Sequence, residues 1–145
     1  MDVLALLETE KACRDVVLSA ANAVDQQQYE TLVSLFTEDA TLTRPGGAAL
    51  RGHAEILAAY RAKDPSRLTH HLICNHQVTV LSSMLAESQC KVLLYATDQS
   101  RDVTVQGRLA DAVHQVGTIV DTLTLTDKGW KIQNRQAWFD LRMQA

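Results

Sequence analysis

The spacing of apolar residues changes from a helical period to a strand period part-way along this chain, and that change limits the folds open to it. Between Val3 and about Val24, apolar residues recur every three or four positions, which predicts one long amphipathic helix. From His70 onward they recur at every second position, which predicts strands. Because helices come first and strands follow without alternation, we expect an α+β domain with helices packed on one face of a curved antiparallel sheet.

Interruptions and turn residues set the remaining boundaries. A short second helix is expected at 29–36, ending near 37–39, then a short strand at 40–43 and a third helix from His53 to about Ala62. Four strands are expected at about 70–82, 88–100, 110–126 and 129–140, with the clearest hairpin turn at Asp127-Lys128-Gly129. Since the 145 residues contain no repeat or linker, 1–145 is expected to be a single domain.

Composition and charge argue against several classes of protein. The chain is 46% hydrophobic and 21% charged, which is typical of a soluble globular protein. Its net charge is -3 and its basic residues are scattered, so we expect no nucleic-acid partner. The N-terminus lacks the pattern of a secretory signal and no stretch is long enough to span a bilayer, so no membrane association is expected. Three cysteines without CxxC spacing predict a reduced, cytoplasmic protein.

The segment 67–76 holds three of the five histidines inside an apolar, β-branched run. Histidine changes its charge near neutral pH, so a histidine on the buried face of a strand is a candidate proton carrier. Strand alternation places His70 and His76 on one face, and His71 with Asn75 on the other. Histidines divided in this way cannot converge on one metal ion unless a bulge intervenes, and zinc-binding spacing is lacking, so no metal site is expected.

His71 has two interpretations, and its partner decides between them. It is either a partly buried histidine that donates to a backbone carbonyl or a base that a carboxylate supports. Asp25 is the candidate carboxylate, because it interrupts the apolar stripe between the first two helices and can project towards the sheet. Asp25 also suits a cap for the helix that begins at Gln28 or Tyr29. Periodicity alone does not bring Asp25 to His71.

Five segments, taken in their order, resemble the SnoaL-like branch of the NTF2-like superfamily over nearly the whole chain. They are 4–25, 29–40 with Leu35-Phe36-Thr37-Glu38-Asp39-Ala40, 51–56 with Gly52 and Ile56, 69–75 with His71 and Asn75, and 129–132. The resemblance implies a cone-shaped α+β barrel in which three helices and a strongly bent antiparallel sheet enclose one deep apolar pocket. It also implies a homo-oligomer, a dimer or trimer formed through the outer face of the sheet.

Within that superfamily the chain is similar to the scytalone dehydratase and hexachlorocyclohexane dehydrochlorinase branch at two positions. These are the acid after the first helix, Asp25, and the histidine that opens the first long strand, His71. The resemblance implies that His71 removes a proton from carbon in a β-elimination, while Asp25 orients the imidazole and stabilises the imidazolium. Such a pair needs no cofactor.

The chain departs from the dehydratase pattern around this pair. Val24 and roughly Thr43 stand where the resemblance leads one to expect polarising tyrosines, and a second histidine would fall near Tyr95 or Thr97. The dehydratase substrate itself is therefore not implied. The candidates to bind and polarise a substrate, each of which also suits a packing role, are Asn75, Tyr95 and Tyr60.

Further residues have several interpretations. His114 is expected at the surface or in an interface. Asp121 is a buried carboxylate if its strand face points inwards and a solvated one if a bulge shifts the register, and we favour the solvated state. Arg135, Trp138 and Phe139 either close the pocket or build the oligomer interface, and we favour the interface.

The sequence thus leads to a cofactor-independent lyase or isomerase of dehydratase or cyclase type. Its His-Asp pair would take a proton from a small, mostly apolar ring or carbonyl substrate. The alternative is a non-catalytic ligand-binding or assembly module on the same scaffold, including a role like that of the β subunit of a ring-hydroxylating dioxygenase. An Asp25 carboxylate beyond hydrogen-bond reach of His71, or a pocket filled by side chains, would favour the alternative.

Overall fold

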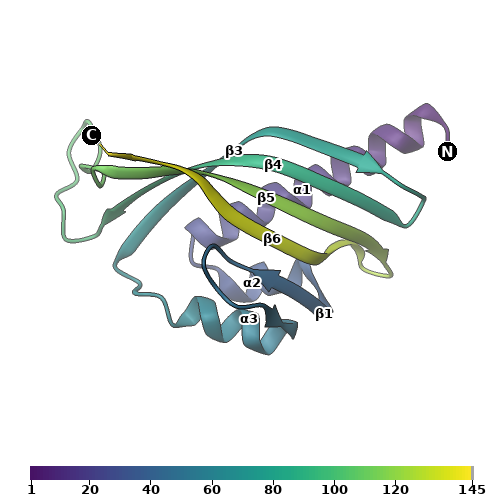
Figure 1. The fold of residues 1–145 in the computed structure, drawn as a ribbon, viewed down its shortest axis with the longest axis horizontal. Coiled ribbons are helices and arrows are strands. Elements are labelled where there is room, and N and C mark those ends of the chain that lie inside the picture. The colour runs from purple at the N-terminus through teal and green to yellow at the C-terminus, as the bar shows by residue number, and fades with distance from the viewer. Residues whose placement is uncertain (145) are drawn as a thin grey trace.

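The helices of this chain lie in its first half and its four long strands follow, as Figure 1 shows. The structure, a computed structural model, describes residues 1–144. In chain order the elements are α1 (Val3–Asp25), α2 (Tyr29–Ser34), β1 (Phe36–Thr43), β2 (Leu50–Arg51), α3 (Gly52–Arg61), β3 (Arg67–Val80), β4 (Leu85–Asp98), β5 (Val113–Thr126) and β6 (Gly129–Gln144). The predicted α+β class and the hairpin turn before Gly129 are confirmed. No helix within residues 1–144 is long and apolar enough to cross a membrane.

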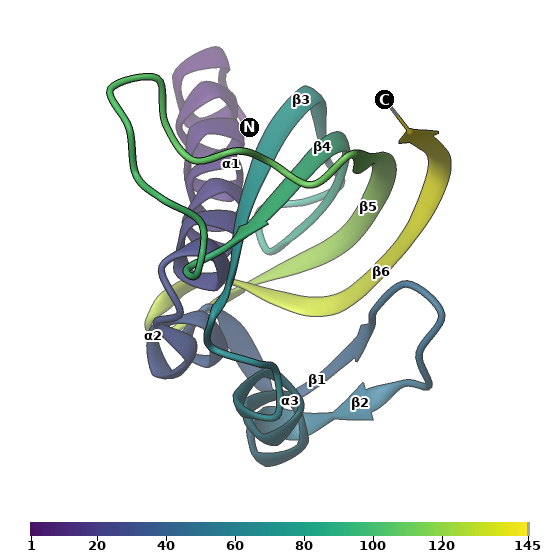
Figure 2. The same ribbon diagram turned by 90° about the vertical axis from the view of Figure 1, so that its left-hand side faces the viewer.

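One six-stranded sheet joins the strands in the order β2-β1-β6-β5-β4-β3. The four long strands pair antiparallel with their neighbours in sequence. β1 instead pairs parallel with β6, so the sheet is mixed and not wholly antiparallel as predicted. A parallel pair needs a long crossover, and this one contains α3 and three long strands, which local spacing cannot indicate. The sheet bends strongly but does not close into a barrel, because β2 and β3 form its edges (Figure 2).

The second helix is shorter than predicted, and the first strand is longer. α2 ends at Ser34 and β1 begins at Phe36, although the helical spacing continues to about 37–39. Phe36 is 2% exposed and pairs with Ile132 of β6, whose backbone N–H donates to the Leu35 carbonyl at 2.9 Å. Pairing with β6 therefore overrides the local helical pattern at this point.

α1 lies alongside β3, across the concave face of the sheet (Figure 2). The central part of its apolar stripe is buried, through Cys13, Val17, Ala20, Ala21 and Ala23. The predicted stripe also includes Leu4 and Leu7, which are 67% and 55% exposed because the first turns of α1 project beyond the strands (Figure 1). α2 and α3 pack against β1 and, with the sheet, complete a core. Its largest fully buried apolar side chains are Phe36, Leu32, Leu42, Ile56, Leu123 and Ile132.

A bulge in β3 reverses part of the predicted strand alternation. The register with β4 shifts between Cys74 and Gln77, and Asn75 has φ of 48°. Beyond the shift, His76 lies on the inner face, where its Nε2 is 2.6 Å from the hydroxyl of the buried Ser88. Asn75 is exposed. The prediction that His71 and Asn75 share the inner face while His76 lies outside was therefore wrong for the two residues at the bulge.

Candidate active site

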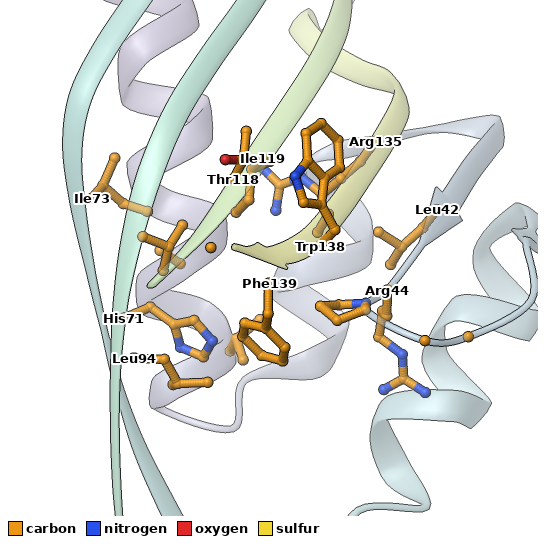
Figure 3. A pocket seen from close by; sticks show the side chains of 18 of the residues that line it. Leu42, Arg44, His71, Ile73, Leu94, Thr118, Ile119, Arg135, Trp138 and Phe139 are labelled. Atoms are coloured by element: carbon orange, nitrogen blue, oxygen red, sulfur yellow. The ribbon is translucent and has the colours of Figure 1, made fainter. Parts of the chain in front are cut away.

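A cavity of about 380 Å³ opens on the concave side of the sheet. Its walls come from α1, from β1 and the turn after it, from the end of α3 and from all four long strands. Figure 3 shows the His71 ring on one wall, near Leu94, with Phe139 facing it. The apolar lining residues include Val17, Ala21, Val24, Leu42, Ile73, Val92, Leu94, Ile119, Ala137, Trp138 and Phe139. This lining and size suit a small, mostly apolar molecule.

Asp25 and His71 meet at the wall of this cavity. Asp25 Oδ1 lies 2.5 Å from His71 Nδ1 and accepts a hydrogen bond of 2.8 Å from the Thr69 hydroxyl. Asp25 Oδ2 accepts the backbone N–H of His71 at 2.7 Å. The Asp25 and His71 side chains are only 16% and 21% exposed. Three hydrogen bonds from β3 thus hold the carboxylate and fix the orientation of the imidazole.

These hydrogen bonds decide which ring nitrogen of His71 carries the proton when the ring is neutral. Burial opposes the negative charge of Asp25, but hydrogen bonds from His71 and Thr69 outweigh it and hold the pKa of Asp25 below its ordinary value of 3.8. An ionised carboxylate can only accept, so Nδ1 of His71 carries the proton between the two side chains. In the neutral ring Nε2 is then a proton acceptor.

The corner after α1 positions Asp25, which does not cap the next helix. The N-cap of α2 is Gln28, whose side chain makes no capping hydrogen bond. Gln27 has φ of 57°, and its side chain donates to the carbonyls of Pro65 and Arg67 at 3.0 and 3.3 Å. These contacts fasten the corner to the start of β3, and so bring Asp25 to the level of His71.

Of the three predicted substrate-binding residues, the cavity wall contains Tyr60. Burial raises the pKa of the Tyr60 hydroxyl, so this group remains a neutral donor at physiological pH. Asn75 lies outside the cavity, at the bulge. Tyr95 lies next to a separate hollow with His70, and its ring stacks on that of His114 with 5.2 Å between centroids. The structure therefore places Tyr60 in the cavity that His71 lines, but neither Asn75 nor Tyr95.

A buried ion pair between β5 and β6 forms another part of the wall. Arg135 donates from Nε and Nη2 to the two oxygens of Asp121, at 2.7 and 2.8 Å, and Asp121 is 1% exposed. The expectation of a solvated Asp121 was wrong, and Arg135 is buried in the cavity wall instead of exposed for an interface. The sequence carried one signal, the alignment of Asp121 with Ile119 and Leu123, but the β5–β6 register was needed to find its partner.

Two other basic residues of the wall, Arg44 and Lys63, escaped the sequence analysis because each is a single charge beside a turn. Three of the other four histidines have side-chain partners elsewhere. His53 Nε2 is 2.9 Å from the Phe36 carbonyl, while His76 and His114 contact Ser88 and Tyr95. In the described part of the chain, no three His, Cys, Asp or Glu side chains form a group that could hold a metal ion.

Comparison with known sequences assigns this chain to a family. The sequence profile of the SnoaL-like domain matches residues 5–136. The chain belongs to the SnoaL-like domain family. This result confirms the SnoaL-like resemblance found in the sequence. No curated protein matches the sequence of this SnoaL-like domain.

Several solved structures share the fold of this SnoaL-like domain. The LinA-type3 hexachlorocyclohexane dehydrochlorinase of Novosphingobium barchaimii LL02 has a TM-score of 0.80 and 18% identity, over 99% of this chain and 94% of that one. A provisionally assigned scytalone dehydratase of Novosphingobium aromaticivorans has a TM-score of 0.79 and 18% identity, over 97% and 89%. A provisionally assigned aromatic ring hydroxylase of the same organism has a TM-score of 0.77 and 23% identity, over 96% and 94%. At these identities the likeness establishes the fold.

Proposed function

We propose that this SnoaL-like domain is a cofactor-independent lyase or isomerase in which His71 is the general base and Asp25 orients it. One observation carries the proposal: an ionised carboxylate fixes Nδ1 of a cavity-wall histidine at 2.5 Å and leaves Nε2 free to accept a proton. The similarity to a dehydratase and a dehydrochlorinase supports the same class of reaction.

In the proposed reaction, Nε2 of His71 takes a proton from a carbon of the substrate. The electrons of the broken C–H bond form a carbon–carbon double bond as a leaving group departs, or they form an enolate. Protonation of that enolate at another atom completes an isomerisation; in a cyclisation its carbon instead bonds to a carbonyl carbon of the same molecule, whose oxygen takes up the proton. Asp25 stabilises the imidazolium formed in this step, because the two side chains share a hydrogen bond in a partly buried site. The apolar walls favour a small ring or carbonyl compound as the substrate.

Two cavity residues can support the developing negative charge on the substrate. Tyr60 offers a neutral hydroxyl, and the Arg135 guanidinium uses two of its five N–H donors on Asp121 and has others left. Asn75 and Tyr95 receive no role in this proposal, since both lie outside the cavity.

The test is carbon-bound hydrogen exchange in D₂O, followed by NMR for a panel of cyclic ketones and β-hydroxy ketones. We expect His71→Gln to slow exchange by about 10²–10⁴-fold, because it removes the general base. Asp25→Asn should also slow the exchange, since an asparagine amide does not keep the proton of His71 on Nδ1 and so does not leave Nε2 as the acceptor. His70→Gln is the matched control, because His70 precedes His71 and lies outside the cavity.

An exchange rate unchanged in His71→Gln would contradict the proposed mechanism. Exchange no faster than the protein-free rate for every ketone would support the alternative, a non-catalytic ligand-binding or assembly module, for which the likeness to a ring hydroxylase is the relevant observation. In that case the chain should purify from its source with a larger subunit.

A further inference from the structure

Two cations converge on one aromatic ring at the cavity wall. The Arg44 guanidinium carbon and the Lys63 ammonium nitrogen each lie 4.9 Å from the centre of the Tyr60 ring. Arg44 directly follows β1, and Lys63 lies just after α3, so two separate segments bring these charges together. Arg44, Lys63 and Tyr60 all line the cavity that His71 lines. Figure 3 shows Arg44 and His71 on opposite sides of Phe139.

These two cations differ from the neighbouring basic residues in their partners. Arg61, on the same helix as Tyr60, pairs with Glu30 at 2.9 Å, and Arg67 pairs with Asp111. Within residues 1–144, no carboxylate lies within ion-pair distance of Arg44 or Lys63, and neither side chain donates a hydrogen bond. Aromatic contact contributes less to a cation than a charged partner would, so both groups retain most of their capacity to bind an anion.

Their proximity has an electrostatic cost that an anion would relieve. Burial of the ammonium lowers the pKa of Lys63, and repulsion from Arg44 lowers it further. The Asp25 carboxylate acts in the opposite direction and raises the pKa of Lys63. Because Arg44, Lys63 and His71 line one cavity, a negative group between the two cations would lie in the same cavity as His71.

We propose that Arg44 and Lys63 form a subsite for a carboxylate group of the substrate, placed beside the Tyr60 ring. Arg44 can bind both oxygens of a carboxylate, while Lys63 adds a point charge from the other segment. The ring of such a substrate would occupy the apolar cavity, with its carboxylate at Arg44 and Lys63 and a C–H bond towards Nε2 of His71. This inference rests on the proposed function and narrows its substrate class to small cyclic carboxylic acids.

Binding of matched probes tests the subsite without a known substrate. We would titrate the ¹⁵N-labelled protein with benzoate, cyclohexanecarboxylate and 2-naphthoate, and with their neutral amides, and follow the amide resonances of cavity residues by NMR. At low salt, at least one carboxylate should bind about tenfold more tightly than its amide, as expected for one charge-assisted contact. Added NaCl should reduce this preference, because the subsite is near the surface.

Substitutions locate the preference. Arg44→Gln with Lys63→Gln should bring each carboxylate to the affinity of its amide, and Lys63→Gln alone should remove part of the preference. Arg61→Gln is the matched control, because it removes the same charge two residues before Lys63 but outside the cavity. Equal binding of carboxylates and amides by the unmodified protein would overturn the proposal, as would failure of every carboxylate to bind. An equal loss of preference in Arg61→Gln would overturn it too.

Failure of this inference is distinguishable from failure of the proposed function. His71→Gln should retain the carboxylate preference, since its imidazole is not part of the subsite. If His71→Gln stops hydrogen exchange but the carboxylates show no preference, the general base stands and the subsite is wrong. If the preference for carboxylates is lost on substitution of Arg44 and Lys63, but His71→Gln leaves the rate of hydrogen exchange unchanged, the subsite is supported and the catalytic proposal is wrong.

Discussion

At the scale of single residues, Asp25 stands where a negative charge is least favoured by the backbone. It is the last residue of α1, and the carbonyl end of a helix dipole repels an anion. Three hydrogen bonds from Thr69 and His71 nevertheless keep it ionised. A carboxylate placed there for stability alone would be a poor choice, which is consistent with a role in orienting His71.

The Asp121–Arg135 pair is a second case in which one residue depends on another, and it makes a stability prediction. Asp121→Asn should lower the free energy of unfolding by about 3–5 kcal/mol, because it leaves the buried Arg135 without its counter-charge. Chemical denaturation measures this loss. Asp15→Asn provides the control, since Asp15 pairs with Lys11 on the surface and should contribute less than about 1 kcal/mol. Similar losses in the two variants would show that Arg135 does not need Asp121.

At this scale the sequence predicts residue types better than partners. Asp25 and His71 were found through a family resemblance, because nothing in the spacing of either residue brings a helix end to a strand 46 positions away. Asp121 was recognised as a candidate buried carboxylate, but its state depended on Arg135, 14 positions further along. Arg44 and Lys63 carried no signal, because their significance comes from a shared ring in the folded protein.

At the scale of elements, the bulge in β3 decides which histidines face inwards. The four long strands were predicted close to their observed limits, because a period of two extends over many residues. The bulge depends on the backbone of few residues, chiefly Asn75 with its φ of 48°, and no periodic pattern reveals it. Likewise, the sequence pattern of β1 does not show that it pairs with β6 and not with β3, at the other edge of the four long strands.

Substitution of Asn75 tests the backbone requirement of this bulge. Asparagine tolerates the left-handed region, glycine adopts it freely and a β-branched residue does not. We expect Asn75→Val to lower the free energy of unfolding by about 1–2 kcal/mol and Asn75→Gly to change it by less than about 1 kcal/mol. Equilibrium unfolding in urea provides both values. A valine variant as stable as the glycine variant would show that the left-handed backbone at position 75 is not required for stability.

At the scale of the whole molecule, the sheet has two faces with different surroundings. Its concave face carries His71 and Leu94, packs against α1 and borders the cavity. By strand alternation, the residue next to each of these along its strand points to the other side. On that outer side the register aligns Leu72, Leu93, Val116 and Leu141 in one row across β3 to β6. Leu72 and Leu141, at the ends of this outer row, are 52% and 58% exposed.

An apolar row of this kind, on a chain that belongs to this family, leads to our last prediction: a homodimer or homotrimer assembled through the outer row. Covering Leu72 and Leu141 with a second copy would remove apolar surface from water, which is the main contribution to stable subunit contacts. Leu141→Lys would place a charge in that contact and should shift sedimentation velocity towards the monomer. Leu18→Lys is the matched control, because Leu18 is 50% exposed on α1, away from the row. A chain that sediments as a monomer, or an oligomer that Leu141→Lys leaves intact, would exclude this interface.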